Sequence, residues 1–143
     1  DIEKTGLANH RKDNVAFIFQ SYNLIDYLTP KENVALTAKL SPQPILERVG
    51  LTEEESKRNV LKLSGGQQQR VAIARALESD AKVILADEPT GNLDEDTAAE
   101  IISILKECAH QMKKCVVIVT HSNELAKQAD TVFCLKKGRL QQL

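Results

Sequence analysis

Two short stretches of the chain combine residue types that could handle a phosphate ester. The first is Leu63–Arg70, with the sequence Leu-Ser-Gly-Gly-Gln-Gln-Gln-Arg. A serine and two glycines at a helix start present backbone N–H groups that, with the helix dipole, favour a bound anion. The second is Val83–Glu88, an apolar run that ends in Asp87 and Glu88. Two adjacent carboxylates can divide the work: one holds Mg²⁺, and the other orients and deprotonates a water.

Two further apolar runs end in side chains that could join such a site. His121 follows the run 116–120, and Gln20 follows the run 15–19. Ligands of open parallel sheets bind at the carboxyl ends of the strands. We therefore interpret His121 as a group that contacts a terminal phosphate or the attacking water, and Gln20 as part of a metal or water shell. Taken alone, the carboxylates would indicate a solvated turn, and the histidine a structural residue.

The elements that must position these side chains are strands and helices in alternation. Continuous β-branched runs favour a parallel sheet that is covered on both faces. The helical segments between them predict an α/β fold, and 143 residues fit one domain. The predicted strands are Val15–Phe19, Val83–Ala86, Val116–Thr120 and Thr131–Leu135.

Two helices have clear start signals. Ser64 has the position of an N-cap, and Gln67 three residues later completes the capping-box spacing. A second helix is predicted to begin near Asp94, which taken alone is most simply an N-cap. Its apolar stripe at helical spacing consists of Ala98, Ile101, Ile102, Leu105, Ala109 and Met112.

The region between Tyr22 and Lys62 differs in character, because prolines and a glycine divide it into short pieces. We expect a small helical subdomain there, inserted between the first strand and the helix that begins at Ser64. Its predicted helices are Lys31–Leu40, Ile45–Val49 and Glu53–Leu61.

Composition argues against several other classes of protein. A net charge of −1 and only five aromatic residues disfavour a nucleic-acid-binding surface, so no nucleic acid is expected as a partner. The three cysteines have no metal-ligand spacing, which favours reduced intracellular thiols. No apolar run approaches the roughly 20 residues that a membrane-spanning helix needs.

Together these motifs resemble the ATPase domain of ABC transporters, which has a P-loop NTPase-like α/β fold. Their order and rough spacing agree with the family from about Asn14 to the end of the chain. The forms Phe19–Leu24 and Pro89–Asp94 are most similar to exporters of lipoproteins, macrolides and antimicrobial peptides. The matching motifs are the signature (Leu63–Arg70), Walker B (Val83–Glu88), the D-loop (Gly91–Asp94), the switch histidine (His121) and the Q-loop glutamine (Gln20).

The resemblance implies ATP and Mg²⁺ as cofactors and a head-to-tail pair of subunits around them. Glu88 is then the general base and His121 its catalytic partner, while Asp87 and Gln20 support Mg²⁺. The implied nucleotide-contacting residues are Gln20, Ser64, Gly65, Gly66, Gln67 and Asp94. Of these, Ser64, Gly65 and Gly66 face the γ-phosphate of ATP bound mainly by the other subunit.

The resemblance also implies a membrane permease as partner, with the helical subdomain, from about residue 21 to 63, docking on it. The protein would then act in the cytoplasm, peripheral to the inner face of the cell membrane. Residues 1–143 are expected to form part of one ABC ATPase domain.

One departure from the family concerns the phosphate-binding loop. None of the six glycines is followed by Lys, so the chain has no Gly-Lys-Ser/Thr loop. Without that loop and the strands around it, we expect the chain to be a truncated domain that does not bind ATP alone. Exposed sheet edges would then invite self-pairing.

Two alternative functions remain open on the sequence. One is an inactive structural or regulatory ABC fragment, favoured by the missing lysine and disfavoured by Glu88 and His121. The other is a non-transport ABC ATPase of the DNA-repair or ribosome-associated kind. No heptad array of the repair type is present, and the near-neutral net charge mildly disfavours both kinds.

Overall fold

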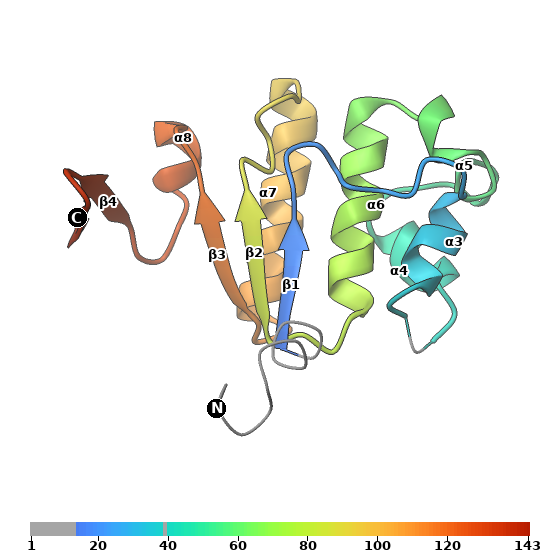
Figure 1. Cartoon of the computed structure of the whole chain (residues 1–143), viewed down its shortest axis with the longest axis horizontal. Coiled ribbons are helices and arrows are strands. Elements are labelled where there is room, and N and C mark those ends of the chain that lie inside the picture. The colour runs from blue at the N-terminus through green and yellow to red at the C-terminus, as the bar shows by residue number, and fades with distance from the viewer. Residues whose placement is uncertain (1–13, 39) are drawn as a thin grey trace.

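The computed structural model describes residues 14–38 and 40–143. Figure 1 shows a sheet with a long helix behind it and a cluster of short helices to one side. In chain order the elements are β1 (Val15–Ile18), α3 (Pro30–Ala35), α4 (Gln43–Arg48), α5 (Glu53–Ser56), the 3-10 helix η1 (Val60–Lys62), α6 (Gly65–Glu78), β2 (Val83–Asp87), α7 (Glu95–His110), β3 (Cys115–Val119), α8 (Asn123–Ala126), β4 (Phe133–Lys136) and β5 (Arg139–Gln142).

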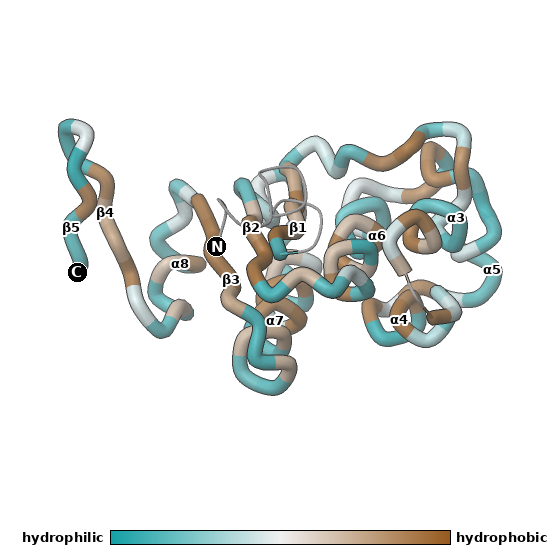
Figure 2. Tube along the Cα trace, turned by 60° about the horizontal axis from the view of Figure 1, so that its bottom comes forward, coloured by the Kyte–Doolittle hydropathy of each residue, from teal (hydrophilic) through white to brown (hydrophobic). Residues whose placement is uncertain are grey.

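Strands β1, β2 and β3 form a parallel sheet in that order. The register pairs Val15 with Val83 and Val83 with Cys115, so the hydrophobic stretches of the strands lie side by side (Figure 2). Because the strands are parallel and in register, their carboxyl ends meet at one edge of the sheet. The predicted α/β fold and parallel core are confirmed.

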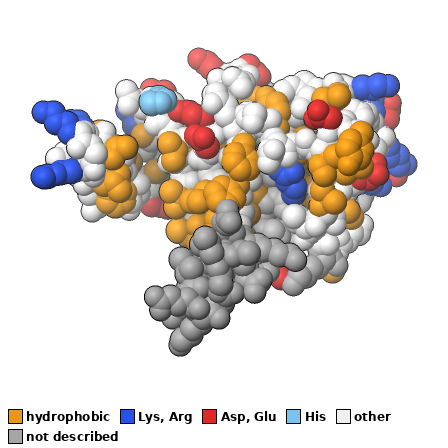
Figure 3. Space-filling model, in the orientation of Figure 1, with side chains coloured by type: hydrophobic (Ala, Val, Ile, Leu, Met, Phe, Trp, Pro, Cys, Tyr) orange, Lys and Arg blue, Asp and Glu red, His pale blue; other side chains and the backbone are white. Residues whose placement is uncertain are grey.

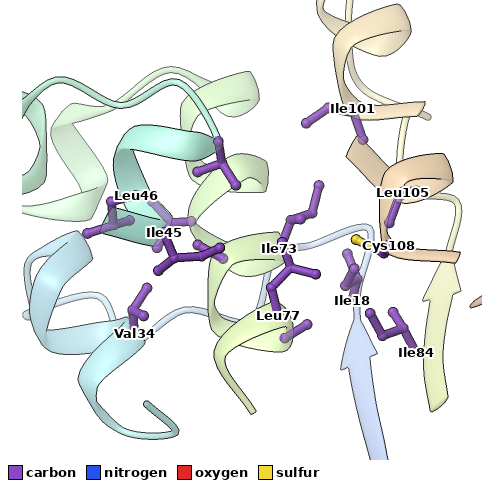
Figure 4. Packing of buried hydrophobic residues seen from close by; sticks show 14 of the residues in the cluster. Ile18, Val34, Ile45, Leu46, Ile73, Leu77, Ile84, Ile101, Leu105 and Cys108 are labelled. Atoms are coloured by element: carbon purple, nitrogen blue, oxygen red, sulfur yellow. The ribbon is translucent and has the colours of Figure 1, made fainter. Parts of the chain in front are cut away.

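Helix α6 is buried between the sheet and the short helices, as Figure 4 shows. On one side Ile73 and Leu77 pack with Ile18 of β1, and on the other side they approach Ile45 of α4. Small side chains at Ala72, Ala74 and Ala76, all buried, let neighbouring elements come close to this helix. Helix α6 therefore packs against both the sheet and the short helices.

Helix starts follow the capping signals of the sequence. Ser64 and Asp94 are the N-caps of α6 and α7, as predicted. Helix α3 ends at Ala35, earlier than predicted, and the Thr37 N–H turns back to the Val34 carbonyl at 3.1 Å in a tighter final turn. The third predicted piece is divided: α5 ends at Ser56, and Asn59 caps the separate helix η1 by accepting from the Leu61 N–H.

The fourth predicted strand exists, but it does not join the parallel sheet. Strand β4 pairs antiparallel with β5, with Lys136 opposite Arg139. Lys137 and Gly138 between them have φ of 49° and 75°, the positive values of a two-residue hairpin turn. This local hairpin was not predicted from the sequence. In it, the backbone hydrogen-bonding groups of β4 pair with those of β5.

Within residues 14–38 and 40–143, the cover expected on both faces of the sheet is found on one face only. Helices α6 and α7 cover one face, whereas Figure 3 shows hydrophobic side chains gathered on the other. There Val117 and Val119 are 44% and 63% exposed, and Phe17 stacks on Phe19. An apolar face of this kind is compatible with self-association, which stays a prediction. Within residues 14–38 and 40–143, the structure contains no helix long and apolar enough to cross a membrane.

Candidate functional site

The carboxylate of Glu88 is held at the carboxyl edge of the sheet by the end of β3. Its Oε1 accepts the backbone N–H of His121 at 2.7 Å, and its Oε2 accepts the Thr120 hydroxyl at 3.1 Å. Only 18% of the Glu88 side chain is exposed. Each carboxylate oxygen has two lone pairs, so these bonds orient the group and leave it able to accept a further proton or hydrogen bond.

The backbone around Glu88 is unusual. Its φ is +45°, a conformation that is uncommon outside glycine and that clusters at functional sites. The Glu88 N–H donates to the Val119 carbonyl at 2.9 Å, and its carbonyl accepts the Gly91 N–H at 3.1 Å. The Glu88 side chain is thereby turned toward the end of β3.

The imidazole of His121 stands free in solvent beside this carboxylate. Its side chain is fully exposed, and its Nε2 lies 4.0 Å from Glu88 Oε1. The ring can therefore contact a group that binds over the sheet edge, while the His121 backbone N–H stays bonded to Glu88.

Gln20 and Asp87 lie at the same edge. Gln20 follows β1, and its amide lies against the turn after Glu88: a Cβ atom added at Gly91 would lie 2.9 Å from Gln20 Nε2. A side chain at position 91 would therefore displace the Gln20 amide from its present place. Asp87 is the exposed last residue of β2.

The start of α6 has the geometry of an anion site. The Ser64 hydroxyl accepts the Gln67 N–H at 3.2 Å, and Gln67 Oε1 accepts the Ser64 N–H at 2.9 Å, which completes the predicted capping box. Among the described residues, the N–H groups of Gly65 and Gly66 have no partner, as expected for the first turn of a helix. They are therefore available to a ligand.

The Gln67 side chain is fully engaged within the chain. Besides closing the capping box, its amide nitrogen donates to a carboxylate oxygen of Glu55 on α5. This contact ties the start of α6 to the short helices. Both polar atoms of the Gln67 side chain therefore have partners within the chain, and its predicted contact with a nucleotide stays a prediction.

The start of α7 lies directly beside the start of α6. A Cβ atom added at Gly66 would lie 2.7 Å from Thr97 Cγ2, and the Thr97 N–H donates to Asp94 Oδ2 at 3.2 Å. Hydrogen bonds from Thr97 lower the pKa of Asp94 below its ordinary value. A pocket of about 180 Å³ at this point is lined by Gly50, Ser64, Gly66, Gln67, Arg70 and Thr97.

The predicted residues thus fall into two groups. Glu88, His121, Gln20 and Asp87 share the sheet edge. At the start of α6, Ser64, Gly66 and Gln67 line a pocket with Thr97 of α7, whereas Gly65 and Asp94 do not line it. The pocket is lined by none of the sheet-edge residues. The segment from Glu88 to Asp94 connects the two groups.

Sequence reasoning missed two contributors, Thr120 and Thr97. Thr120 was assigned only to a strand, although a hydroxyl at a strand end next to His121 is a hydrogen-bonding signal. Thr97 occupies the N3 position after Asp94, where its N–H meets the cap. The contact of Thr97 with Gly66 joins two helices and has no local signal.

The residues present fit a Mg²⁺–nucleotide complex. Mg²⁺ is usually held by one or two carboxylates, with phosphate oxygens and water completing the octahedron. Asp87 offers an exposed carboxylate and Gln20 an amide oxygen at the same edge. No cluster of three or more His, Cys, Asp or Glu side chains suited to a metal occurs in the described part of the chain, so this fit depends on oxygen atoms from the nucleotide.

The parallel sheet flanked by helices is the fold of the P-loop NTPase-like class of ATPase cores, and solved ABC ATPase cassettes share it. Within that class, the chain belongs to the ABC transporter ATP-binding family, whose sequence profile (ABC transporter) matches residues 2–91. The family and fold predicted from the motifs are confirmed.

Individual relatives agree with this assignment. An uncharacterized ABC transporter ATP-binding protein, YclH of Bacillus subtilis, is 42% identical over 96% of the chain and 65% of its own length. The macrolide export ATP-binding/permease protein MacB 2 of Aeromonas hydrophila is 41% identical over 99% of the chain and 23% of its own length. The chain therefore spans less than two-thirds of either relative.

Solved structures agree as well. The dimeric bacterial ABC transporter cassette MJ0796 superposes with a TM-score of 0.83 at 37% identity, over 99% of this chain and 67% of that one. The same cassette in a post-hydrolysis state bound to ADP and Pi gives a TM-score of 0.82.

Proposed function

We propose that the protein is the ATP-binding and ATP-hydrolysing subunit of an ABC transporter that powers export. The observation that carries this proposal is the Glu88 carboxylate, oriented at the sheet edge by the His121 N–H and the Thr120 hydroxyl. Such an oriented carboxylate is what a general base in phosphoryl transfer to water requires.

In the proposed reaction, water attacks the γ-phosphorus of ATP and Glu88 accepts the proton that the water loses. The bond from the γ-phosphorus to its bridging oxygen breaks, and ADP leaves with that oxygen. His121 is placed to contact the γ-phosphate or the water through its exposed ring. Asp87 and Gln20 would hold Mg²⁺, which neutralises charge on the phosphate oxygens.

We further propose that the site is shared between two subunits. The free N–H groups of Gly65 and Gly66, with Ser64 and Asp94 beside them, form a face for a γ-phosphate. This face is separate from the Glu88 edge of the same chain, as a head-to-tail pair requires. MJ0796, which is similar to this chain, is a dimer.

The proposed membrane partner is a permease, contacted by the helical region from about residue 21 to 63. Gln20 supports this role, because it touches the Gly91 turn and leads directly into that region. The Aeromonas relative is named a macrolide export protein with its own permease part. An exporter of this type, acting at the cytoplasmic face of the membrane, is accordingly the proposed setting.

The absence of a Gly-Lys-Ser/Thr loop from the sequence leads to a second proposal. Without that loop, ATP lacks the lysine and the backbone cradle that bind its β- and γ-phosphates. We propose that this chain alone has no appreciable ATP affinity and, by itself, acts at most as a structural or regulatory partner. Titration calorimetry of the chain with MgATP tests this directly, and micromolar binding would contradict it.

The shared site is tested in an extended form, in which this chain is joined to a family segment that carries the missing loop. Two lesions are compared, Glu88→Gln and Ser64→Arg. In a mixed dimer with Glu88→Gln in one subunit and Ser64→Arg in the other, both substitutions fall in the same composite site. The second composite site is then intact, and about half of the hydrolysis rate should remain. Dimers with both lesions in one subunit lose both sites and should be inactive. Equal activity of the two arrangements would contradict the shared site.

A further inference from the structure

A buried amide links the anion-binding helix to the turn that carries Glu88. Gln69 lies in α6 and is 1% exposed. Its Nε2 donates to the backbone carbonyl of Pro89 at 2.6 Å. Its Oε1 is buried without a hydrogen-bond partner among the described residues. The side chain therefore makes one short bond, and that bond goes to the residue directly after Glu88.

The Pro89 carbonyl is a sensitive point of this turn. Pro89 is itself buried, and its ring fixes its own φ. The turn is closed by the Gly91 N–H on the Glu88 carbonyl and anchored by the Glu88 N–H on Val119. The hydrogen bond from Gln69 to the Pro89 carbonyl holds the turn at a third point and connects it to α6.

Packing alone does not account for an amide at this position. A methionine of similar length would fill the same space without leaving an unpaired buried oxygen, which is unfavourable in a core. The amide differs from such an apolar side chain in one useful property: it can donate to Pro89. Its effect is therefore expected on the position of the turn more than on stability.

We propose that Gln69 is a positioning residue. It sets the orientation of Glu88 according to whether a phosphate is bound at the start of α6. Gln69 follows Gly66 by three residues, within one turn of the same helix. A shift of α6 when Ser64–Gly66 meet a phosphate is passed through Gln69 to Pro89 and so to Glu88. The inference rests on the proposed function, because it couples the phosphate face of one composite site to the base of the other.

The first test uses this chain alone and needs no nucleotide. The amide proton of His121, bonded to the Glu88 carboxylate, reports on the position of that carboxylate in a ¹H–¹⁵N spectrum. In Gln69→Met the turn loses its third fixed point, and the His121 amide proton should move upfield by several tenths of a ppm. The matched control is Ile73→Val, which loosens the same helix without touching Pro89 and should leave that proton in place.

An unchanged His121 amide in a folded Gln69→Met chain would overturn the proposal. Gln69→Leu provides a second variant without a donor, and the same upfield shift is expected in it. Failure of both variants to fold, with Ile73→Val folded, would assign Gln69 to stability and would also overturn the proposal.

The second test measures hydrolysis in the extended form. Gln69→Met should lower kcat by between about 10- and 100-fold, because a misplaced catalytic group costs that much, with the KM for ATP unchanged. A higher KM at unchanged kcat would contradict a positioning role. If the unmutated extended form does not hydrolyse ATP, the proposed function fails, whereas the His121 signal still decides whether Gln69 positions Glu88.

Discussion

Replacing Thr120 with Val tests whether the end of β3 holds the Glu88 carboxylate. The Thr120 hydroxyl makes two contacts, donating to Glu88 Oε2 at 3.1 Å and accepting the Ser122 N–H at 3.0 Å. Valine keeps the β-branched shape that suits a strand and removes only the hydroxyl. Both contacts are lost, but the shape of the residue is preserved.

The expected loss of stability follows from these contacts. A hydrogen bond to a charged group contributes about 1.5–3 kcal/mol. Glu88 keeps the His121 N–H at 2.7 Å and is partly open to water, and the exposed Ser122 N–H can bond to solvent instead. We therefore expect the free energy of unfolding to fall by about 1–2 kcal/mol. In the extended form, a similar loss of orientation in the transition state would lower kcat about tenfold.

Urea unfolding followed by circular dichroism measures the first effect, with an unchanged m-value as the sign of an unchanged fold. Thr120→Ser is the matched control: it keeps the hydroxyl and should remain within about 0.5 kcal/mol of the original chain. If Thr120→Val is as stable as Thr120→Ser, the hydroxyl does not hold Glu88 and the reasoning is refuted.

Three further predictions concern other parts of the site and core. Ser64→Ala removes the cap that accepts the Gln67 N–H and should lower stability by about 1 kcal/mol in urea unfolding, whereas Ser64→Asp should not. Burial raises the pKa of the Cys108 thiol to about 11, so at pH 8 about one molecule in a thousand carries the thiolate. Peptide mapping after treatment with iodoacetamide should therefore find the exposed Cys115 modified long before Cys108. Equal labelling of the two cysteines would contradict the burial of Cys108. The pKa of Asp94 is lowered in the folded state, so its contribution to stability is complete above the ordinary aspartate pKa of about 3.9 and is lost as the pH falls through the folded value. Between about pH 5 and pH 3, the range in which carboxylates titrate, the urea midpoint of Asp94→Asn should therefore fall less than that of the unmutated chain.

Local signals were sufficient to predict the helix starts and the strands of the parallel sheet. Ser64 and Asp94 cap helices through bonds to residues three positions away, so the short sequence pattern contains the whole interaction. Strands β1 to β3 are recognisable because their sequences are continuous apolar runs, although in the structure only one face of these runs packs against α6 and α7. The positions of Glu88 and His121 at one edge then follow from parallel topology.

Pairing and side-chain partners between elements were not accessible in the same way. Whether the run before Lys136 joins a parallel sheet or a hairpin depends on which strand it meets, and the Lys137-Gly138 turn signal was not used. The engagement of Gln67 with Glu55 joins two helices. The bond from the His121 main chain to Glu88 involves a backbone group, which residue types alone do not reveal.

The most direct test of the account is single-turnover hydrolysis by Glu88→Gln in the extended form. Glutamine keeps the size of the side chain but cannot take the proton from water, and general-base catalysis contributes about 10²–10⁴-fold. We predict that the variant binds ATP as the unmutated form does and releases phosphate at least about 100-fold more slowly. Release of phosphate at the unmutated rate would remove Glu88 from the role of general base and contradict the central claim.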